Sequence, residues 1–343
     1  MTEVSSRRRV RVPVQSLVLL GVIVVASLVF FVLSPSFLSV GNVGNVLLQA
    51  APTVVAAVGM TFVIMTGGID LSVGSLINLA MVAAIAASGV TSASSGDSSG
   101  WTYVVAIAVA LACGLFNGLA INLLKVHPLL VTLGTLTLYR GIALHITGAG
   151  DRAAAGPITA LGRGDIGGIA VPIIVAIVVV LLGSFVMRST VFGRQVVALG
   201  GSERSARETG LPVRRLRIAV YVISALCAVI SGILTVGQIG TLQVSLGVNY
   251  EFTVITAVIV GGTSLFGGKG SIVGTALGAL LLTVIVNGLN SIDASIYVYD
   301  VVRGLVLVAA VLADSLTTRR LSLRRRGRQK QILAEATSAG AHA

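Results

Sequence analysis

The sequence predicts an all-α polytopic membrane protein with about ten transmembrane helices, some of them interrupted, and with both termini in the cytoplasm. Three observations lead to this fold class. Of the 343 residues, 55% are hydrophobic and only 10% are charged, against roughly 25% charged in an average soluble domain. Apolar runs long enough to cross a bilayer as helices recur from Leu17 to Leu312. Basic residues are concentrated in alternate loops, which is typical of a chain that crosses a membrane repeatedly.

The predicted spans follow the apolar runs in order. They cover Leu17–Leu33, Val46–Thr66, Leu71–Gly89, Thr102–Leu124, Pro128–Thr147, Val171–Met187, Leu216–Gly237, Tyr250–Gly262, Ser271–Leu289 and Ile296–Leu312. The first run is longer than the ~7 to 15 apolar residues of a signal peptide, so we expect a retained helix. The run before Gly261 is short, which favours a half-helix over a full span.

The basic residues set the orientation. With ten spans and both ends inside, most of the 24 Lys and Arg residues lie in inner segments, as cytoplasmic loops require. The exceptions are Arg140, Arg152, Arg163 and Arg303. The resulting organisation is a cytoplasmic basic N-terminus (1–16), a single transmembrane domain (17–316) with a cytoplasmic loop at 188–216, and a cytoplasmic basic tail (317–343) that we expect to be disordered. Such a tail beside a last span meets anionic lipid, and no nucleic-acid partner is expected.

Two glycine-rich segments interrupt the apolar pattern. The chain reads GGIDLSVGS from Gly67 to Ser75 and GGTSLFGGKGSI from Gly261 to Ile272. Non-helical backbone at membrane depth persists only where protein or a water-filled cavity surrounds it, and broken helices border the pathway in many transporters. The glycines expected to allow close helix packing are Gly67, Gly68, Gly74, Gly261, Gly262, Gly270, Gly274 and Gly278.

Polar residues inside apolar runs are the candidates for a translocation pathway. Asp70 has two interpretations: a cap for the following helix, or a pathway residue that binds a polar solute or a proton. The intramembrane amides either connect helices or line a polar route, because an amide in hydrocarbon must find a partner. The pathway candidates are Asp70, Asn78, Asn117, Asn122, Asn287 and Asn290.

The loop at 188–216 carries the clearest soluble feature. Ser202 is placed to cap a short helix, two pairs of opposite charge stand four residues apart, and Gly210 is placed to stop the helix. One short charged helix at a membrane surface is either a solvated connector or a docking element for a partner. The residues assigned to docking are Gly200, Gly201, Ser202, Glu203, Arg204, Ala206, Arg207, Glu208 and Gly210.

Enzyme motifs are missing from the sequence. The spacing of a phosphate-binding loop fails because Lys269 is followed by Gly270. No nucleophile elbow and no metal-binding histidine pair occur, and the three histidines are dispersed. We therefore expect neither catalytic residues, nor a metal site, nor a bound cofactor.

Four segments carry a family likeness: GMTFVIMTGGIDLSVGS (from Gly59), ALGGSERSARETGLPVRRLRIAVY (from Ala198), VIVGGTSLFGGKGSIVGTALGALLL (from Val258), and NGL followed by YDVVRGLVLVAAVLAD near the end. Taken together, these four segments resemble the permease subunits of ribose- and xylose-type sugar ABC importers. The likeness covers roughly Val43 to Asp314, while the outer loop from Gly148 to Val171 and the tail do not match.

This resemblance implies a function and a set of partners. It implies a bacterial inner-membrane permease that carries a monosaccharide, dimerises with a second permease copy, identical or not, and receives sugar from an extracytoplasmic binding protein. ATP is bound and hydrolysed by a separate cytoplasmic ABC ATPase, whose groove receives the helix within Gly200 to Gly210. The alternatives are a branched-chain amino-acid ABC permease and an ion-coupled secondary transporter, for which Asp70 is the one plausible coupling acid.

Overall fold

The computed structural model describes residues 14–87, 100–154, 157–295 and 297–315. Most of the predicted N-terminal region (1–16) and the whole predicted tail (317–343) lie outside the described residues. Within the described ranges the chain is mostly helical. The structure thus confirms the helical class.

The helices correspond closely to the apolar runs. Their bounds are α1 (Val14–Leu33), the 3-10 helix η1 (Pro35–Leu38), α2 (Val40–Met65), α3 (Val73–Ala87), α4 (Trp101–Leu124), α5 (Pro128–Thr147), α6 (Pro157–Arg163), α7 (Val171–Ser189), α8 (Val191–Gly201), α9 (Glu203–Glu208), α10 (Val213–Ile239), α11 (Tyr250–Val260) and α12 (Ile272–Ser291). Residues 297–315 form a further helix. Each of the ten predicted spans therefore contains a helix.

The helices differ in whether they are long enough to cross a bilayer. In the described part of the chain, 7 helices are long and apolar enough to do so: α1, α2, α4, α5, α7, α10 and α12. The α3 and α11 helices are shorter, with 15 and 11 residues. The half-helix expected before Gly261 is confirmed, whereas the third predicted span is shortened because its first residues belong to a turn. A total of ten crossings and the cytoplasmic termini remain predictions.

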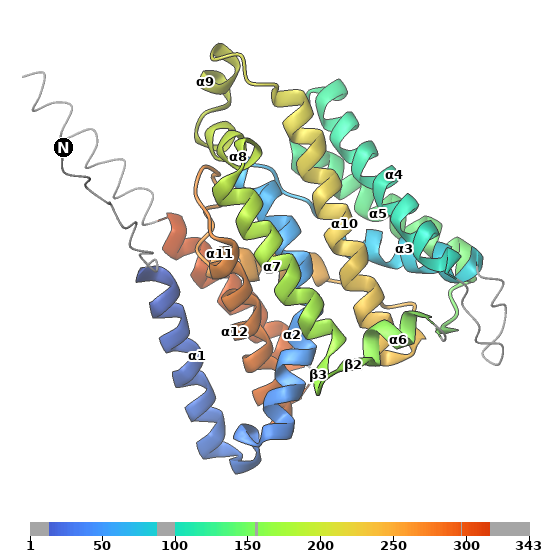
Figure 1. The fold of residues 1–343 in the computed structure, drawn as a ribbon, viewed down its shortest axis with the longest axis vertical. Coiled ribbons are helices and arrows are strands. Elements are labelled where there is room, and N and C mark those ends of the chain that lie inside the picture. Colours follow the sequence, from blue (N-terminus) through green and yellow to red (C-terminus); the bar gives the residue numbers. More distant parts are fainter. Residues whose placement is uncertain (1–13, 88–99, 155–156, 296, 316–343) are drawn as a thin grey trace, which may run out of the picture.

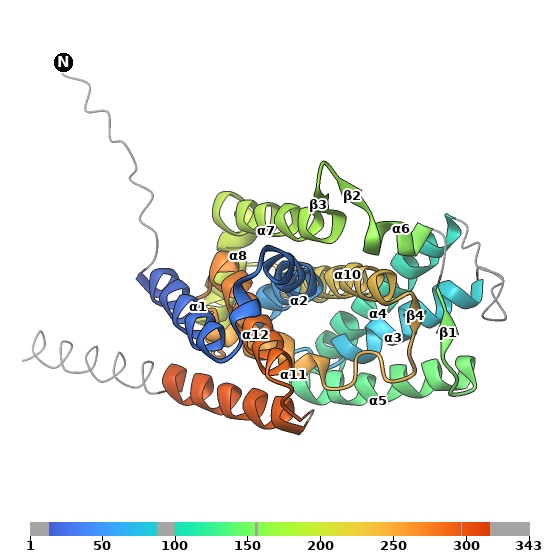
Figure 2. The same ribbon diagram turned by 90° about the horizontal axis from the view of Figure 1, so that it is seen from below.

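The core of the molecule lies around α2 and α10, which pack against each other along their length. Figure 2 shows α2 between α7 on one side and α11 and α12 on the other, while α3, α4 and α5 group around α10. The α2 helix is buried over most of its length, and α1 packs mainly on α12 and stays largely exposed. Exposed apolar side chains on α1, α5 and α7 are expected where lipid replaces water as the solvent.

The two ends of the helix bundle carry different elements (Figure 1). At one end α8 and α9 lie beside the start of α10, and the end of α4 lies at the same end of the bundle. Toward the other end, α6 and the hairpin of β2 (Asp165–Ile166) and β3 (Ile169–Ala170) lie beside the end of α10. A second two-stranded ladder pairs β1 (Arg152–Ala153) with β4 (Thr241–Leu242). These short strands were not expected from the sequence.

Candidate functional sites

The α9 helix has the local structure that the sequence predicts. The Ser202 hydroxyl accepts a hydrogen bond from the Ser205 amide at 3.2 Å, which satisfies one free donor of the first turn. The two predicted ion pairs form: Arg207 Nη2 lies 2.6 Å from Glu203 Oε1, and Arg204 Nε lies 3.0 Å from Glu208 Oε1. Gly210 follows with φ of 77°, a backbone angle that glycine adopts without strain.

Glu203 also attaches α9 to α10. Its Oε2 accepts from Arg217 Nη2 at 2.9 Å, so one carboxylate bridges two arginines on different elements. Partial burial raises the pKa of Glu203, but the hydrogen bond from Arg207 and the charge of Arg217 outweigh that effect, and the net pKa is lowered. On the inner side of α9, Ala206 is buried with Leu199, Val213 and Leu216. Ala206 is thus an anchor of the helix rather than part of its exposed face.

The loop contains a second helix, which corrects the prediction of one. The α8 helix runs from Val191 to Gly201 and is capped by the Thr190 hydroxyl, which accepts from the Gly193 amide at 3.2 Å. The apolar side chains of α8, such as the buried Val196 and Leu199, occur at helical spacing. That spacing was the available signal for the element.

The two glycine-rich breaks, 194 residues apart along the chain by the positions of Gly67 and Gly261, come together beneath the end of α8. The Gly268 amide donates to the Met65 carbonyl at 2.9 Å, which joins the second break to the last residue of α2. Gly200 of α8 lies against both of these groups, so that a side chain at this position would overlap backbone atoms. We call Met65, Gly200 and Gly268 the glycine junction. It connects α8 to α2 and to the segment before α12.

The other predicted packing glycines lie at several contacts. Gly68 lies beside the Tyr221 hydroxyl, Gly74 against the Gly247 carbonyl, Gly261 against Thr275, Gly274 against Gly261, Gly278 against Ala257, and Gly270 beside Met65 and Thr263. Gly67 and Gly262 have φ of 77° and 90° and occupy turns. The contacts of Gly274 and Gly278 bring α11 and α12 together at close range, as small residues do between membrane helices.

Asp70 is buried and held by protein groups. Its Oδ1 accepts from the Ser72 amide at 3.0 Å and from the Ser72 hydroxyl at 2.6 Å. Its Oδ2 accepts from the Ser224 hydroxyl of α10 at 3.2 Å. The Ser72 carbonyl accepts the first hydrogen bond of α3, so the carboxylate stabilises the start of that helix from three residues before Val73. The geometry favours the cap interpretation.

The five candidate asparagines do not form one cluster. Asn117 donates to the Ser72 hydroxyl at 2.8 Å and accepts from Tyr139 at 3.2 Å. Asn122 donates to the Arg214 carbonyl at 3.1 Å. Asn287 accepts from Asn42 at 2.9 Å, and Asn290 is exposed. Each buried amide thus satisfies its polar atoms within the protein.

Asn78 and Arg140 hold a non-helical segment inside the membrane domain. Residues 243–249 connect β4 to α11, and the carbonyls of Val244 and Leu246 each accept two hydrogen bonds. The Arg140 guanidinium donates to them at 2.7 and 2.9 Å, and the Asn78 amide at 3.2 and 2.9 Å. Arg140 lies two turns before the end of α5, about 10 Å along the helix. At such depth exposed backbone carbonyls need protein donors, which explains an arginine within an apolar helix.

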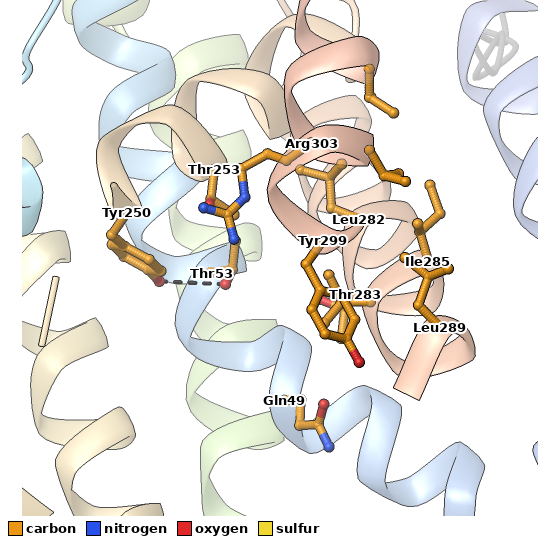
Figure 3. Close-up of a pocket in the computed structure, with 13 residues that line it drawn as sticks. Gln49, Thr53, Tyr250, Thr253, Leu282, Thr283, Ile285, Leu289, Tyr299 and Arg303 are labelled. Carbon is orange, nitrogen blue, oxygen red and sulfur yellow. Dashed lines mark hydrogen bonds between the residues drawn. The ribbon is translucent and has the colours of Figure 1, made fainter. Parts of the chain in front are cut away.

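A cavity of about 230 Å³ opens between α2, α11, α12 and the helix 297–315. Its polar lining residues are Gln49, Thr53, Tyr250, Thr253, Thr283, Tyr299 and Arg303. Figure 3 shows Arg303 extending toward Thr53 and Tyr250, whose hydroxyls lie 3.4 Å apart. Such a volume holds several waters, each of which occupies about 30 Å³ in the liquid. We call this space the polar cavity.

None of the pathway candidates chosen from the sequence lines the polar cavity. Arg303 forms the predicted ion pair with Asp300, at 3.5 Å, but it also faces the cavity. The threonines and tyrosines give no signal in a sequence, because the same residues commonly pack within apolar helices. Glu251, the first acidic residue of α11, is buried beside Gly74. An acidic residue inside a predicted membrane span is a signal for a functional or buried polar contact, and Glu251 was not among the predicted site residues.

Comparisons with known proteins identify relatives over most of the chain. Residues 42–311 match the family model described as "Branched-chain amino acid transport system / permease component". The chain is 37% identical to the ribose import permease protein RbsC of Haemophilus influenzae over 82% of this chain and 88% of the relative. It is 38% identical to RbsC of Escherichia coli K12, over 82% and 88%. The D-allose transport system permease protein AlsC of E. coli K12 is 33% identical, over 85% and 89%. No solved structure matches the chain.

Proposed function

The chain belongs to the family of permease components of branched-chain amino acid transport systems, and we propose that within this family it carries a monosaccharide. It is a transmembrane permease subunit of a bacterial ABC importer and a multi-pass protein of the inner membrane. The observation that carries the sugar assignment is that relatives named for ribose and for D-allose cover more than four fifths of the chain. These names favour a sugar over a branched-chain amino acid.

The proposed organisation has ten membrane crossings and both termini in the cytoplasm, with α8 and α9 on the cytoplasmic side. Residues 17–316 form the membrane domain and the two terminal regions flank it. The loop charges support this orientation, because inner loops hold most of the basic residues. The permease is not an enzyme. It binds no cofactor in this proposal, and ATP is bound by the ATPase.

The α9 helix is the proposed contact with the ATPase. Its exposed residues from Ser202 to Glu208 present paired charges, Ala206 anchors the helix, and Gly200, Gly201 and Gly210 shape its two ends. Motion of α9 would reach the membrane domain by two connections: the Glu203–Arg217 ion pair to α10, and the glycine junction to α2 and α12. Movement of packed elements as rigid bodies is a common way to open a pathway alternately to each side.

The polar cavity is the proposed wall of the sugar pathway. Hydroxyl, amide and guanidinium groups are the donors and acceptors that a sugar needs when it leaves water, and the cavity lies between four membrane helices. Asp70, Asn78, Asn117 and Asn122 then act indirectly, because they hold α3, α4, α10 and the 243–249 segment in place, and Asn287 does so by joining α12 to α2. Asn290, which is exposed near the end of α12, remains a candidate for contact with the sugar. The other proposed partners are an extracytoplasmic sugar-binding protein and a second permease copy.

Uptake into proteoliposomes tests this function. Permease, ATPase and sugar-binding protein are reconstituted together, and entry of radiolabelled ribose, allose and leucine is measured with and without ATP. We expect ATP-dependent entry of a sugar and none of leucine. Uptake that needs no ATPase and follows a proton or sodium gradient would contradict the proposal. The Thr53→Val and Arg303→Gln variants should lower sugar entry while ATP hydrolysis by the complex continues.

A further inference from the structure

A second cavity, of about 540 Å³, lies at the end of the bundle that carries α9. It is an open space bordered by the turn between α4 and α5, the α9 helix and the first turns of α10. Its charged and ionisable lining residues are Lys125, His127, Glu203, Arg207, Arg214 and Arg217. We call this space the basic cavity. It is distinct from the polar cavity, with which it shares no lining residue.

The basic cavity has cationic charge that the protein does not neutralise. Glu203 is its one acidic lining residue, and both carboxylate oxygens already pair with Arg207 and Arg217. No carboxylate among the described residues lies within ion-pair distance of Lys125 or Arg214. These two cations, at the end of α4 and the start of α10, therefore remain available to an anion.

Apolar side chains also occur on the α4 and α5 side of the cavity. Ile121 and Val126 contribute to its lining. Next to Lys125, Leu123 and Leu124 are 74% and 66% exposed, and Leu130 of the first α5 turn is 60% exposed. Cations at the ends of two apolar helices that also carry exposed leucines suit an amphiphile, whose head carries negative charge and whose chains require hydrocarbon.

Lys125 itself has an unusual backbone. It ends α4 with φ of 55°, a left-handed conformation in which glycine is the common choice at a helix end. A lysine in this conformation costs more backbone energy than a glycine would. Its side chain gives the position a cationic group that glycine lacks.

We propose that the basic cavity binds the phosphate group of an anionic phospholipid, with the acyl chains lying along α4 and α5. Lys125 and Arg214 contact the phosphate, and Arg207 and Arg217 add positive potential. Free phosphate has the same head chemistry, but it would leave the leucines beside the cavity unpartnered. The proposal depends on the membrane placement of α4 and α5 and not on the identity of the transported sugar.

Lipid retention by the purified permease tests the proposal. The full chain is reconstituted in nanodiscs of equal phosphatidylglycerol and phosphatidylcholine, released into mild detergent, and its bound lipids are counted by native mass spectrometry. The test variant is Lys125→Gln with Arg214→Gln. The matched control is Arg188→Gln with Arg215→Gln, two exposed arginines of inner segments that do not line the cavity. We expect the test variant to bind phosphatidylglycerol about 20- to 30-fold more weakly, from about 1 kcal/mol per cation at 1.4 kcal/mol per tenfold.

Further variants and displacement experiments identify the bound ligand and distinguish a loss of charge from a loss of folding. Lys125→Arg with Arg214→Lys keeps both charges and should retain the lipid, which shows that charge rather than folding is measured. Equal retention by the test and control variants would overturn the proposal. Displacement of all bound phosphatidylglycerol by millimolar inorganic phosphate would reassign the cavity to a free anion, and displacement by the ATPase subunit would reassign it to an acidic protein surface.

Discussion

Asp70 shows how one buried carboxylate orders three segments. It receives hydrogen bonds from Ser72 at the start of α3 and from Ser224 of α10. We expect Asp70→Ala to lower the free energy of unfolding by about 1–3 kcal/mol or more, because buried donors lose their acceptor. Thermal unfolding of the detergent-solubilised protein measures this loss. Asp70→Asn keeps one acceptor oxygen toward Ser72 and should lose less.

The result separates the two interpretations of this residue. A capping role predicts that transport and stability fall together across the two variants. A wild-type unfolding temperature with abolished uptake in Asp70→Asn would instead indicate that the carboxylate contacts the solute. The cap could be predicted from the sequence, because the acid precedes an apolar run. Its contact with Ser224, 154 residues later, could not be predicted, because no local pattern indicates which helices meet.

At the scale of elements, alanine substitutions at two neighbouring glycines of α8 should have opposite effects on stability. A side chain at Gly200 would overlap the Met65 carbonyl and the Gly268 amide, whereas nothing lies within 4 Å of the same position at Gly201. Gly200→Ala should therefore destabilise the protein by about 1–3 kcal/mol, the usual range for overpacking. Gly201→Ala should be neutral or slightly stabilising, because alanine favours helix. Unfolding temperatures of the two variants, compared in one detergent, measure the difference, and equal values would exclude a tight glycine junction.

The attachment of α9 to α10 depends on pH through Glu203. Its pKa is lowered in the folded protein from an ordinary value of 4.5. The ion pairs with Arg207 and Arg217 thus contribute their stability fully above about pH 4.5, and they lose it as the pH falls through the lowered pKa. We expect the backbone amides of α9 to exchange hydrogen faster at about pH 3.5 than at about pH 6, after correction for intrinsic exchange rates. These two pH values lie roughly one unit or more below and above the unperturbed pKa of a glutamate.

A variant pair checks the origin of this pH effect. Glu203→Gln should remove the pH dependence of α9 and leave that of other helices intact. Arg204→Gln is the control, since the Arg204–Glu208 pair is largely exposed, with 89% and 63% of the two side chains accessible, and such pairs contribute little. An unchanged exchange profile in Glu203→Gln would show that another group controls the opening of α9.

Elements were easier to predict than their contacts. The apolar runs located the long helices to within a few residues, because burial in lipid or protein selects the same side chains. The α8 helix was missed because it lies in a basic loop between two predicted spans and is too short to be a span itself. The 243–249 segment was missed because its backbone is held by Arg140 and Asn78 from other helices. Every residue has a backbone carbonyl, so the sequence does not indicate which carbonyls accept hydrogen bonds from distant side chains.

For the whole molecule, the predicted orientation makes a direct prediction about accessibility. Arg204→Cys on α9 should react with a membrane-impermeant maleimide only after cells are permeabilised, and Ile166→Cys in the β2–β3 hairpin should react in intact cells. Both positions are exposed, at 89% for the Arg204 side chain and 63% for Ile166. The native thiols, Cys113 and Cys227, are buried, so the unmodified chain is the background control. The reverse labelling pattern would invert the proposed topology.

The polar cavity is a property of the whole molecule and could not be assembled from the sequence. Its lining comes from α2 and, about 200 residues later, from the consecutive helices α11, α12 and 297–315. Intramembrane polarity identified the asparagines instead, since amides are conspicuous in an apolar run. In the structure Asn78, Asn117 and Asn287 hydrogen-bond to neighbouring protein groups, and a role of the asparagines in the pathway stays a prediction.

The brevity of α11 has a consequence for biosynthesis. A segment of 11 residues is about 16 Å long, half of the hydrocarbon thickness, so a translocon cannot stably release it into lipid as an independent unit. Its polar entrance at residues 243–249 depends on Arg140 and Asn78, which emerge from the ribosome much earlier. The early helices must therefore already be assembled as a template when this part of the chain is synthesised, and defects in them should appear as misinsertion of α11.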